Sequence, residues 1–223
     1  MDKRIIIMSG HYGSGKTNIA VNFALDMKNK YDKVTIADID IVNPYFRTKD
    51  SEEQLKKAGI RLICSEYANT NIDIPALPQE IYSVTDDKTQ RCILDVGGDE
   101  RGALALGRIA PYIREENDYE MIYVVNMYRP LTRDADSAIE VMREIEAACK
   151  IKFTEIINNS NLGAETTAED VLNSVAYAEE ISQKTGIPIK FTTVEQALLE
   201  PLKNKIKALY PLRLQRNSVK ECL

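Results

Sequence analysis

The chain alternates short apolar runs with longer stretches in which apolar residues recur every three or four positions. Runs rich in valine, isoleucine and leucine are typical of strands that are covered on both faces. We expect strands at residues 4–8, 33–37, 60–63, 91–94, 121–125, 155–157 and 188–192. Because helical patterns fit between them, the alternation predicts an α/β fold, with a parallel sheet between two layers of helices.

Several of the intervening stretches carry clear helix signals. Residues 19–27 and 135–149 repeat apolar positions every three or four residues, as one face of a helix does. Thr167 and Asp170 fit a capping box, in which both side chains satisfy backbone N–H groups at the start of a helix. Residues 68–84 contain two prolines and little period, so we expect an irregular connection with one short helix.

The length of 223 residues, without an internal repeat or a linker, predicts one domain over residues 1–223. Its tail, residues 201–223, is rich in lysine and arginine and is interrupted by Pro211. We expect the tail to be a solvated terminal segment, with a basic docking patch as the alternative.

Charge and composition narrow the class of protein. The net charge of −5 gives no reason to expect a nucleic-acid-binding surface. No apolar run approaches the roughly 20 residues that span a bilayer, and the N-terminal apolar run is too short for a secretory signal. The four cysteines show no C-x-x-C spacing, which favours free thiols. We therefore expect a cytoplasmic protein.

The first predicted strand and the first predicted helix are joined by the sequence GHYGSGKT, residues 10–17, which fits the phosphate-binding pattern G-x-x-x-x-G-K-[ST]. Glycines let such a loop curl so that its N–H groups point inward at an anion, beside the positive end of a helix. Lys16 would reach the β- and γ-phosphate oxygens, and the Thr17 hydroxyl would bind Mg²⁺. The residues expected to hold the nucleotide are Gly10, His11, Tyr12, Gly13, Ser14, Gly15, Lys16, Thr17 and Asn18.

Carboxylates follow two other predicted strands. The second strand ends in ADID, which contains Asp38 and Asp40, and the fourth ends in LDVGG, which contains Asp95. Open α/β sheets bind ligands at the carboxyl ends of their strands, so these side chains are candidates for binding a metal ion. Asp38 and Asp40 would share one face if the strand geometry continued past residue 37. The alternative role for each aspartate is a helix cap or turn residue.

The phosphate loop, the DID segment and the DVGG segment resemble the MinD/ParA/CobQ-type proteins of the SIMIBI class of P-loop NTPases. The resemblance covers roughly residues 4–193 and implies a three-layer α/β/α fold with a mostly parallel sheet of seven or eight strands. It also implies Mg²⁺-dependent ATP hydrolysis and, in many members, a nucleotide-dependent homodimer that acts on a protein partner. By position, Asp38 and Asp95 would lie around the metal and Asp40 would orient the attacking water, so Lys16, Asp38 and Asp40 are the expected catalytic residues.

One departure from that family concerns the position after the first glycine of the loop. The family places a signature lysine there, which reaches the nucleotide of the other subunit, whereas this chain has His11. A neutral imidazole supplies no fixed positive charge. Arg47 or Arg101 is a candidate replacement, and His11 would either contact the γ-phosphate region or pack within the loop.

The sixth predicted strand ends in NNSNLG, and an asparagine at this place reads the base in this class. Asn158 and Asn159 are equally good candidates. Guanine-specific loops carry an aspartate three residues later, but Asn161 and Leu162 stand at those positions. We therefore favour ATP over GTP, while a turn-capping role for the amides remains the alternative.

Together these features predict an ATP-binding, Mg²⁺-dependent ATPase that acts as a switch or energy coupler. Residues 43–50 would be either a packed surface loop or a switch-like loop, with residues 97–102 as its counterpart in the second case. Two alternatives remain open on the same fold. One is an ATP-dependent ligase of the dethiobiotin synthetase kind, and the other is a nucleotide-binding adaptor that does not turn over. Cys64 and Cys92 are expected within strands, which argues against a metal-cluster role.

Overall fold

A computed structural model describes residues 3–40, 48–64 and 78–213 of the chain. Its centre is a single sheet with the strand order β3-β2-β4-β1-β5-β6-β7-β8, and every neighbouring pair is parallel. The strands are β1 Ile5–Ser9, β2 Val34–Ile39, β3 Arg61–Ile63, β4 Arg91–Val96, β5 Tyr119–Val125, β6 Glu155–Asn158, β7 Ile189–Glu195 and β8 Leu209–Leu212. All seven predicted strands are present.

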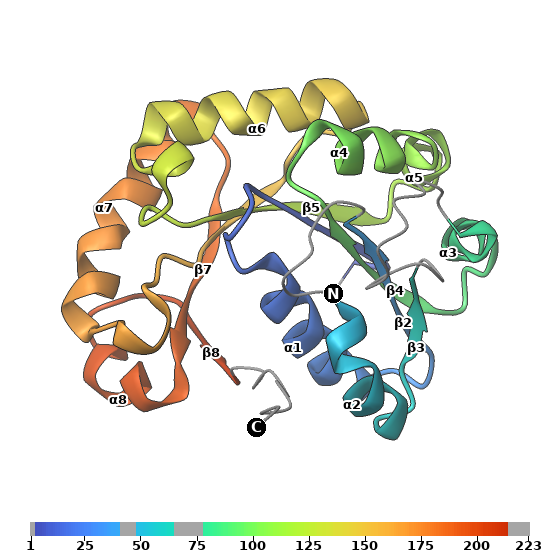
Figure 1. Cartoon of the computed structure of the whole chain (residues 1–223), viewed down its shortest axis with the longest axis horizontal. Helices are drawn as coiled ribbons and strands as arrows, with labels where there is room; N and C mark the ends of the chain where they lie inside the picture. Colours follow the sequence, from blue (N-terminus) through green and yellow to red (C-terminus); the bar gives the residue numbers. More distant parts are fainter. Residues whose placement is uncertain (1–2, 41–47, 65–77, 214–223) are drawn as a thin grey trace, which may run out of the picture.

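Helices cover both faces of this sheet (Figure 1). They are α1 Lys16–Lys28, α2 Glu52–Lys57, α3 Ser83–Asp86, α4 Glu100–Gly107, α5 Ala110–Glu116, α6 Ala135–Cys149, α7 Ala168–Thr185 and α8 Leu199–Leu202. Short 3-10 helices are η1 Thr48–Ser51, η2 Gln79–Tyr82, η3 Pro130–Thr132, η4 Gly163–Glu165 and η5 Gln196–Leu198. The predicted three-layer α/β fold with a parallel sheet of seven or eight strands is confirmed.

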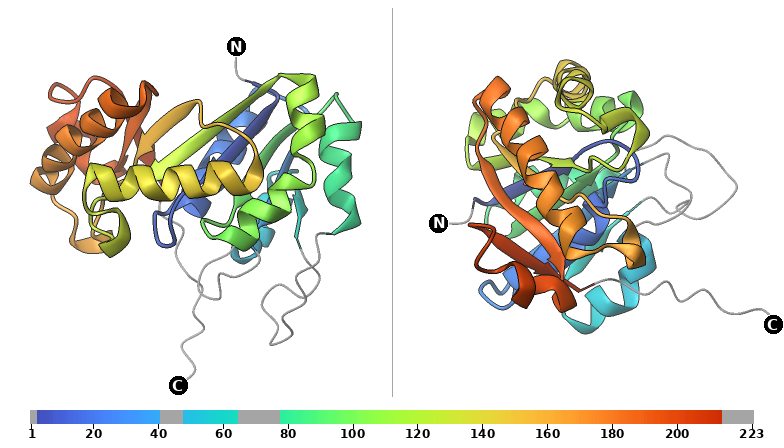
Figure 2. Two further views of the ribbon diagram at one scale, coloured as in Figure 1. Left: turned by 90° about the horizontal axis from the view of Figure 1, so that it is seen from above. Right: turned by 90° about the vertical axis from the view of Figure 1, so that its left-hand side faces the viewer.

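The alternation of side chains along each strand separates the two hydrophobic layers. Ile5 and Ile7 of β1 pack with α4, α5 and α6, which lie together on one face of the sheet (Figures 1 and 2). Ile6 and Met8 point the other way and pack with α1 and α2. Strands buried on both faces need apolar side chains at nearly every position, which explains their continuous apolar runs.

The predicted helix boundaries agree with the structure where a cap signal was present. Thr167 and Asp170 form the reciprocal hydrogen bonds of a capping box at the start of α7. Gly186 ends the same helix in the left-handed conformation, with φ of 73°. The predicted connection at residues 68–84 lies partly outside the described residues, and its described end forms η2 and the start of α3.

The expectation for the tail was wrong over residues 201–213. Leu202, Ile206 and Leu212 are buried, and residues 209–212 form the edge strand β8 beside β7. Pro211 is accommodated because an edge strand has one side without a neighbour that needs its N–H. Asn22 of α1 fixes the end of this strand, since its amide exchanges two hydrogen bonds of 3.0 Å with the backbone of Arg213.

Two further sequence expectations concern cysteines and membranes. Within the described ranges, Cys92 and Cys149 are buried free thiols. Cys92 lies in β4 as expected, whereas Cys64 follows the last residue of β3 rather than lying within it. No helix in the described ranges combines the length and the apolar character that crossing a bilayer requires.

Candidate nucleotide-binding site

The GHYGSGKT segment joins the carboxyl end of β1 to the first turn of α1, as its pattern predicts. Gly15 caps α1 with φ of 84°, a left-handed conformation that glycine adopts without a steric penalty. A Cβ atom at Gly15 would lie 2.3 Å from the Asn159 amide nitrogen, so a side chain there would also disrupt the wall of the site. The geometry leaves the loop amides and the N-terminus of a 13-residue helix beside each other, which is an arrangement suited to an anion.

Lys16, in the first turn of α1, is buried among carboxylates. Its Nζ lies 2.9 Å from Oδ2 of Asp40, and only 3% of the residue is exposed. Burial alone would lower the pKa of Lys16, but the charges of Asp40 and Asp95 outweigh it and raise the pKa above its ordinary value. Lys16 is therefore a charged ammonium at neutral pH.

Asp38 and Asp95 stand directly opposite each other on the neighbouring strands β2 and β4. Strand β2 continues to Ile39, two residues beyond the prediction, and the Asp40 N–H donates to Oδ1 of Asp38 at 3.0 Å. The three predicted aspartates are thus gathered around Lys16, as their side chains all contribute to its electrostatic environment.

Asp95 is fully buried, and burial raises the pKa of its carboxyl although Lys16 acts in the opposite direction. The Thr48 hydroxyl donates to Oδ2 of Asp95 at 2.9 Å, and the nearby Thr17 hydroxyl also favours the charged form and lowers the pKa of this carboxyl. Oδ1 of Asp95 and Oγ of Ser14 are buried and make no hydrogen bond with any described residue. Buried polar atoms are normally satisfied, so these two atoms mark places where a ligand would supply the missing partner.

The residues present fit Mg²⁺. Asp38 and Asp95 carboxylates and the Thr17 hydroxyl are the oxygen donors that this ion prefers, and it commonly keeps waters and phosphate oxygens as its other ligands. No cluster of three or more His, Cys, Asp or Glu side chains with metal-binding geometry occurs within the described ranges. The donor set therefore suits a metal held jointly with a phosphate rather than by an all-protein cage.

The loop that follows β4 closes against the phosphate loop. A Cβ atom at Gly98 would lie 1.9 Å from the carbonyl oxygen of Gly10, so only glycine permits this approach. Asp99 then caps α4, because its carboxylate accepts the Gly102 N–H at 3.0 Å. The predicted switch-like segment 97–102 is thus in contact with the phosphate loop, whereas most of the segment 43–50 lies outside the described residues.

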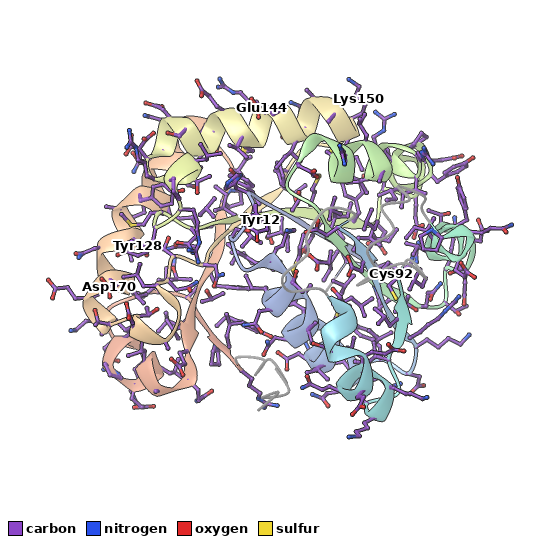
Figure 3. All side chains as sticks on the ribbon, in the orientation of Figure 1. Tyr12, Cys92, Tyr128, Glu144, Lys150 and Asp170 are labelled. Atoms are coloured by element: carbon purple, nitrogen blue, oxygen red, sulfur yellow. The ribbon has the colours of Figure 1, made fainter. Side chains whose placement is uncertain are left out.

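His11 of the phosphate loop is half-buried and Tyr12 is exposed, and Figure 3 shows Tyr12 near the centre of the view. Burial, and then the charge of Lys16, lower the pKa of His11 below its ordinary value of 6.5. The imidazole is therefore neutral at pH 7, as the sequence suggested. Tyr12 is 48% exposed.

A cavity of about 110 Å³ lies beside Gly15 and Asn18, at the carboxyl ends of β6 and β7. Its lining residues are Gly15, Asn18, Asn159, Ser160, Asn161, Gly163, Thr166, Val171, Thr193, Val194, Glu195 and Leu212. The mixture of apolar side chains and amides at the foot of α1 suits the base of a nucleotide whose phosphates occupy the loop.

The structure separates the two asparagines that the sequence left equivalent. Asn159 lines the cavity, and its amide nitrogen donates to the Ser14 carbonyl at 2.5 Å, so it ties the cavity to the phosphate loop. Asn158 is not among the lining residues, because its amide is bonded to Ser174 at 2.8 Å and accepts from Ser160 at 2.7 Å. Asn161 also lines the cavity.

Two residues near the loop were not singled out from the sequence. Thr48 contacts Asp95, and Arg129 donates through Nε to the Gly13 carbonyl at 2.8 Å. Thr48 lies within the segment 43–50, so the sequence pointed to its neighbourhood but not to this residue. No sequence pattern pointed to Arg129, because its contact with Gly13 depends on how the loop after β5 turns. Of the cations suggested in place of the signature lysine, Arg47 lies outside the described residues and Arg101 is exposed on α4.

Comparison with solved structures finds the same fold in the signal recognition particle receptor FtsY. The protein from Elizabethkingia anophelis, in complex with GDP, matches with a TM-score of 0.55 and 17% identity over 87% of this chain and 58% of that one. The cell division protein FtsY of Thermotoga maritima matches with a TM-score of 0.57 and 17% identity over 87% of this chain and 63% of that one. Chloroplast FtsY of Physcomitrella patens matches with a TM-score of 0.57 and 15% identity over 89% of this chain and 60% of that one.

This chain therefore spans about three-fifths of the length of the structures it matches. Searches with the sequence find no matching family model and no matching curated protein. At 15–17% sequence identity, the similarity to these structures establishes the fold alone. The closer assignment to MinD/ParA/CobQ proteins stays a prediction.

Proposed function

We propose that this protein is a Mg²⁺-dependent P-loop ATPase of MinD/ParA/CobQ type that acts as a nucleotide switch or energy coupler for a protein partner. The observation that carries the proposal is the set of three carboxylates around Lys16, at the mouth of a loop whose amides precede a helix. Burying so many charges together costs free energy of folding, and the binding of a metal ion and a phosphate would account for that cost.

The residues divide the work by their chemistry. The amides of residues 13–17 and the Lys16 ammonium bind the phosphate oxygens, while Thr17, Asp38 and Asp95 hold the metal directly or through its waters. When bound, Mg²⁺ neutralises charge on the β- and γ-phosphates. Lys16 turns from Asp40 to the phosphate, and Asp40 then accepts a hydrogen bond from the attacking water.

Adenine is the base that we propose, because the cavity is lined by Asn159, and Leu162 three residues later supplies no carboxylate of the kind that guanine-specific loops present. Asn161, which also lines the cavity, carries an amide: its Oδ1 accepts the Gly163 N–H at 3.1 Å and its Nδ2 donates to the Asn159 carbonyl at 2.7 Å, so the amide is fixed within its own loop. Among the described residues that line the cavity, Glu195 alone carries a carboxylate. One matched FtsY structure is a complex with GDP, so both nucleotides belong in the test.

Binding and turnover test the proposal together. Titration of fluorescent ATP and GTP analogues, with Mg²⁺ or with EDTA, is expected to show Mg²⁺-dependent binding that is tighter for ATP, accompanied by slow phosphate release. Lys16→Ala is expected to abolish both, with circular dichroism showing that the variant is folded. Absence of binding at millimolar nucleotide would contradict the proposal, whereas binding without phosphate release would identify the adaptor.

A further inference from the structure

The phosphate loop lacks the second positive charge that a signature lysine would supply. A Mg²⁺-bound triphosphate keeps net negative charge after the metal and one lysine are counted, and this charge shifts during phosphoryl transfer. His11 is neutral at pH 7 because its pKa is lowered, and it stands where the family resemblance places a lysine. Another cation near the loop would have to act in its place.

Arg129 is placed against the loop by the chain segment that follows β5. Its Nε donates to the Gly13 carbonyl at 2.8 Å, and a Cβ atom at Gly13 would lie 3.3 Å from that nitrogen. The guanidinium therefore lies on the peptide of Gly13, next to the amides that would enclose the phosphates.

The turn that carries Arg129 is held by several hydrogen bonds. Asn126 accepts the Tyr128 N–H through its side chain at 3.0 Å and the Arg129 N–H through its carbonyl at 3.2 Å. The Thr132 hydroxyl donates to the same carbonyl at 2.8 Å. The Tyr128 hydroxyl donates to the Asp170 carbonyl at 2.9 Å, which joins the turn to α7, and Figure 3 shows both residues on one side of the molecule. A cation held in this way is positioned before any ligand binds.

Among the residues that the structure describes, no acceptor binds the remaining N–H groups of Arg129 and would compete with a phosphate. A guanidinium has five donors, and only Nε is used by the Gly13 carbonyl. No carboxylate within the described ranges forms an ion pair with it, in contrast to Arg133, which pairs with Asp134. Paired donors in a fixed plane match the oxygens of a phosphate.

We propose that Arg129 is a catalytic residue of this ATPase, which binds the terminal phosphate oxygens from within the same chain and stabilises the charge that develops on them. The inference rests on the proposed function. It makes the trans-acting lysine of the related family unnecessary, because the cation comes from the loop after β5 of the same subunit.

The test compares Arg129→Ala and Arg129→Lys with Arg133→Ala, a control in the same segment whose side chain is 79% exposed. Phosphate release by Arg129→Ala is expected to fall about a hundredfold or more, since an arginine at the transferring phosphate contributes 10³–10⁵ in other P-loop enzymes. ATP affinity falls while ADP affinity and the melting temperature stay unchanged. Arg129→Lys falls less, and added guanidinium ion at millimolar concentration partly restores Arg129→Ala.

Each result separates the inference from its alternatives. Wild-type turnover in Arg129→Ala would overturn it, and so would an equal loss of ATP and ADP affinity together with a lower melting temperature, which would mark Arg129 as a brace for Gly13. If the wild-type protein binds ATP without hydrolysis, the ratio of ATP affinity to ADP affinity is measured instead. A lower ratio in Arg129→Ala supports the inference, and an unchanged ratio overturns it. If the wild-type protein binds neither nucleotide, the proposed function fails and Arg129 has no phosphate to bind.

Discussion

At the scale of single residues, the concentration of charge around Lys16 is the main physical feature of the site. Three carboxylates share one ammonium in a region closed to water, and burial raises the pKa of Asp95 even though Lys16 is beside it. Burying charge in this way costs free energy of folding that apolar residues would not cost. The cluster is therefore better explained by ligand binding than by stability.

Replacement of Asp95 by asparagine tests this explanation. Because the Asp95 carboxylate is fully buried and its Oδ1 has no donor among the described residues, Asp95→Asn is expected to stabilise the nucleotide-free protein by about 1–2 kcal/mol. The amide oxygen can still accept from Thr48. Urea unfolding at pH 7 without nucleotide measures the change, and Asp32→Asn on the exposed surface is the control. A destabilised Asp95→Asn would show that the carboxylate is a net stabiliser through Lys16.

Base preference is a second property that depends on one side chain. Asn161→Asp would place a carboxylate on the cavity wall, and because a carboxylate cannot donate to the Asn159 carbonyl as the amide does, its oxygens would be able to turn toward both guanine N–H groups. The ratio of GTP to ATP affinity is expected to rise about tenfold, which corresponds to roughly one charge-assisted hydrogen bond. Competition binding measures the ratio, and Asn161→Ala serves as the comparison without a carboxylate. An unchanged ratio would mean that Asn161 does not face the base edge.

The sequence predicted which residues gather at the candidate site better than it predicted their contacts. Lys16 and Thr17 follow from a local motif, and Asp38 and Asp95 from the rule that ligands bind at the carboxyl ends of parallel strands. The approach of Arg129 to Gly13 depends on the path of a loop 116 residues away in sequence, for which no local pattern exists. The same reason explains why Asn158 and Asn159 were distinguished only by the fold.

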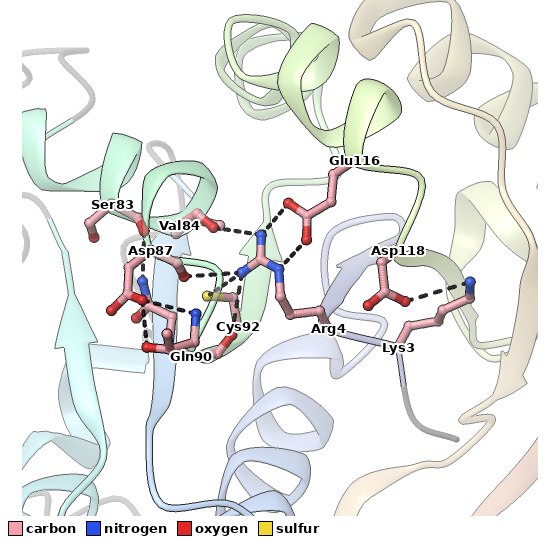
Figure 4. Close-up of polar contacts among 10 residues, drawn as sticks. Lys3, Arg4, Ser83, Val84, Asp87, Gln90, Cys92, Glu116 and Asp118 are labelled. Atoms are coloured by element: carbon pink, nitrogen blue, oxygen red, sulfur yellow. Dashed lines mark hydrogen bonds and ion pairs between the residues drawn. The ribbon is translucent and has the colours of Figure 1, made fainter.

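At the scale of elements, a buried arginine joins several elements at the amino-terminal ends of the strands, which is the end of the sheet away from the phosphate loop (Figure 4). Arg4, before β1, forms a bidentate ion pair with Glu116 of α5, with Nη2 to Oε2 at 2.5 Å. Its guanidinium also donates to the Val84 carbonyl of α3 at 2.9 Å and to the Gln90 carbonyl at 3.3 Å. Burial opposes the charge on Arg4, but the Glu116 pair raises its pKa, and burial raises the pKa of the neighbouring Cys92 to about 12.

Arg4→Met is expected to lower the free energy of unfolding by about 3 kcal/mol, because it leaves the Glu116 carboxylate buried without a partner. Adding Glu116→Leu should recover much of that loss, since the unpaired charge is then removed as well. Lys3→Met is the matched control, because Lys3 forms an ion pair with Asp118 that is nearly half exposed on both sides and is worth little. Urea unfolding of the four proteins measures the effects. Equal losses in the single and double variants would contradict this account.

The strand β8 shows where pattern reading fails at this scale. Residues 203–216 hold five lysines and arginines, and a proline interrupts the segment, so it shows no clear strand-like alternation. Leu202, Ile206 and Leu212 nevertheless bury their side chains, because β7 and α7 would otherwise expose apolar surface. A short edge strand needs only one covered face, and four residues are too few for periodicity to register.

At the scale of the whole molecule, parallel pairing places the phosphate loop, the aspartates and the cavity on one edge of the sheet, since all of them follow strands that run in the same direction. The phosphate loop follows β1, which lies between β4 and β5 near the middle of the sheet. The loops after β4 and β5 therefore contact the phosphate loop from opposite sides, one through Gly98 and the other through Arg129.

A nucleotide bound at this edge lies next to a surface that includes Tyr12, which is 48% exposed. If two subunits meet face to face around the nucleotide, the Tyr12 side chains become buried in the interface, and burial of one such aromatic is worth about 2 kcal/mol. We expect Mg²⁺–ATP to convert monomers to dimers in size-exclusion chromatography with light scattering, and Tyr12→Ser to weaken the dimer about tenfold or more. Because the loop would bind phosphate through backbone N–H groups, which serine keeps, the nucleotide affinity of Tyr12→Ser at low protein concentration should match the wild type. A monomer at saturating ATP would exclude the dimer and leave the same-chain Arg129 as the cation that completes the site.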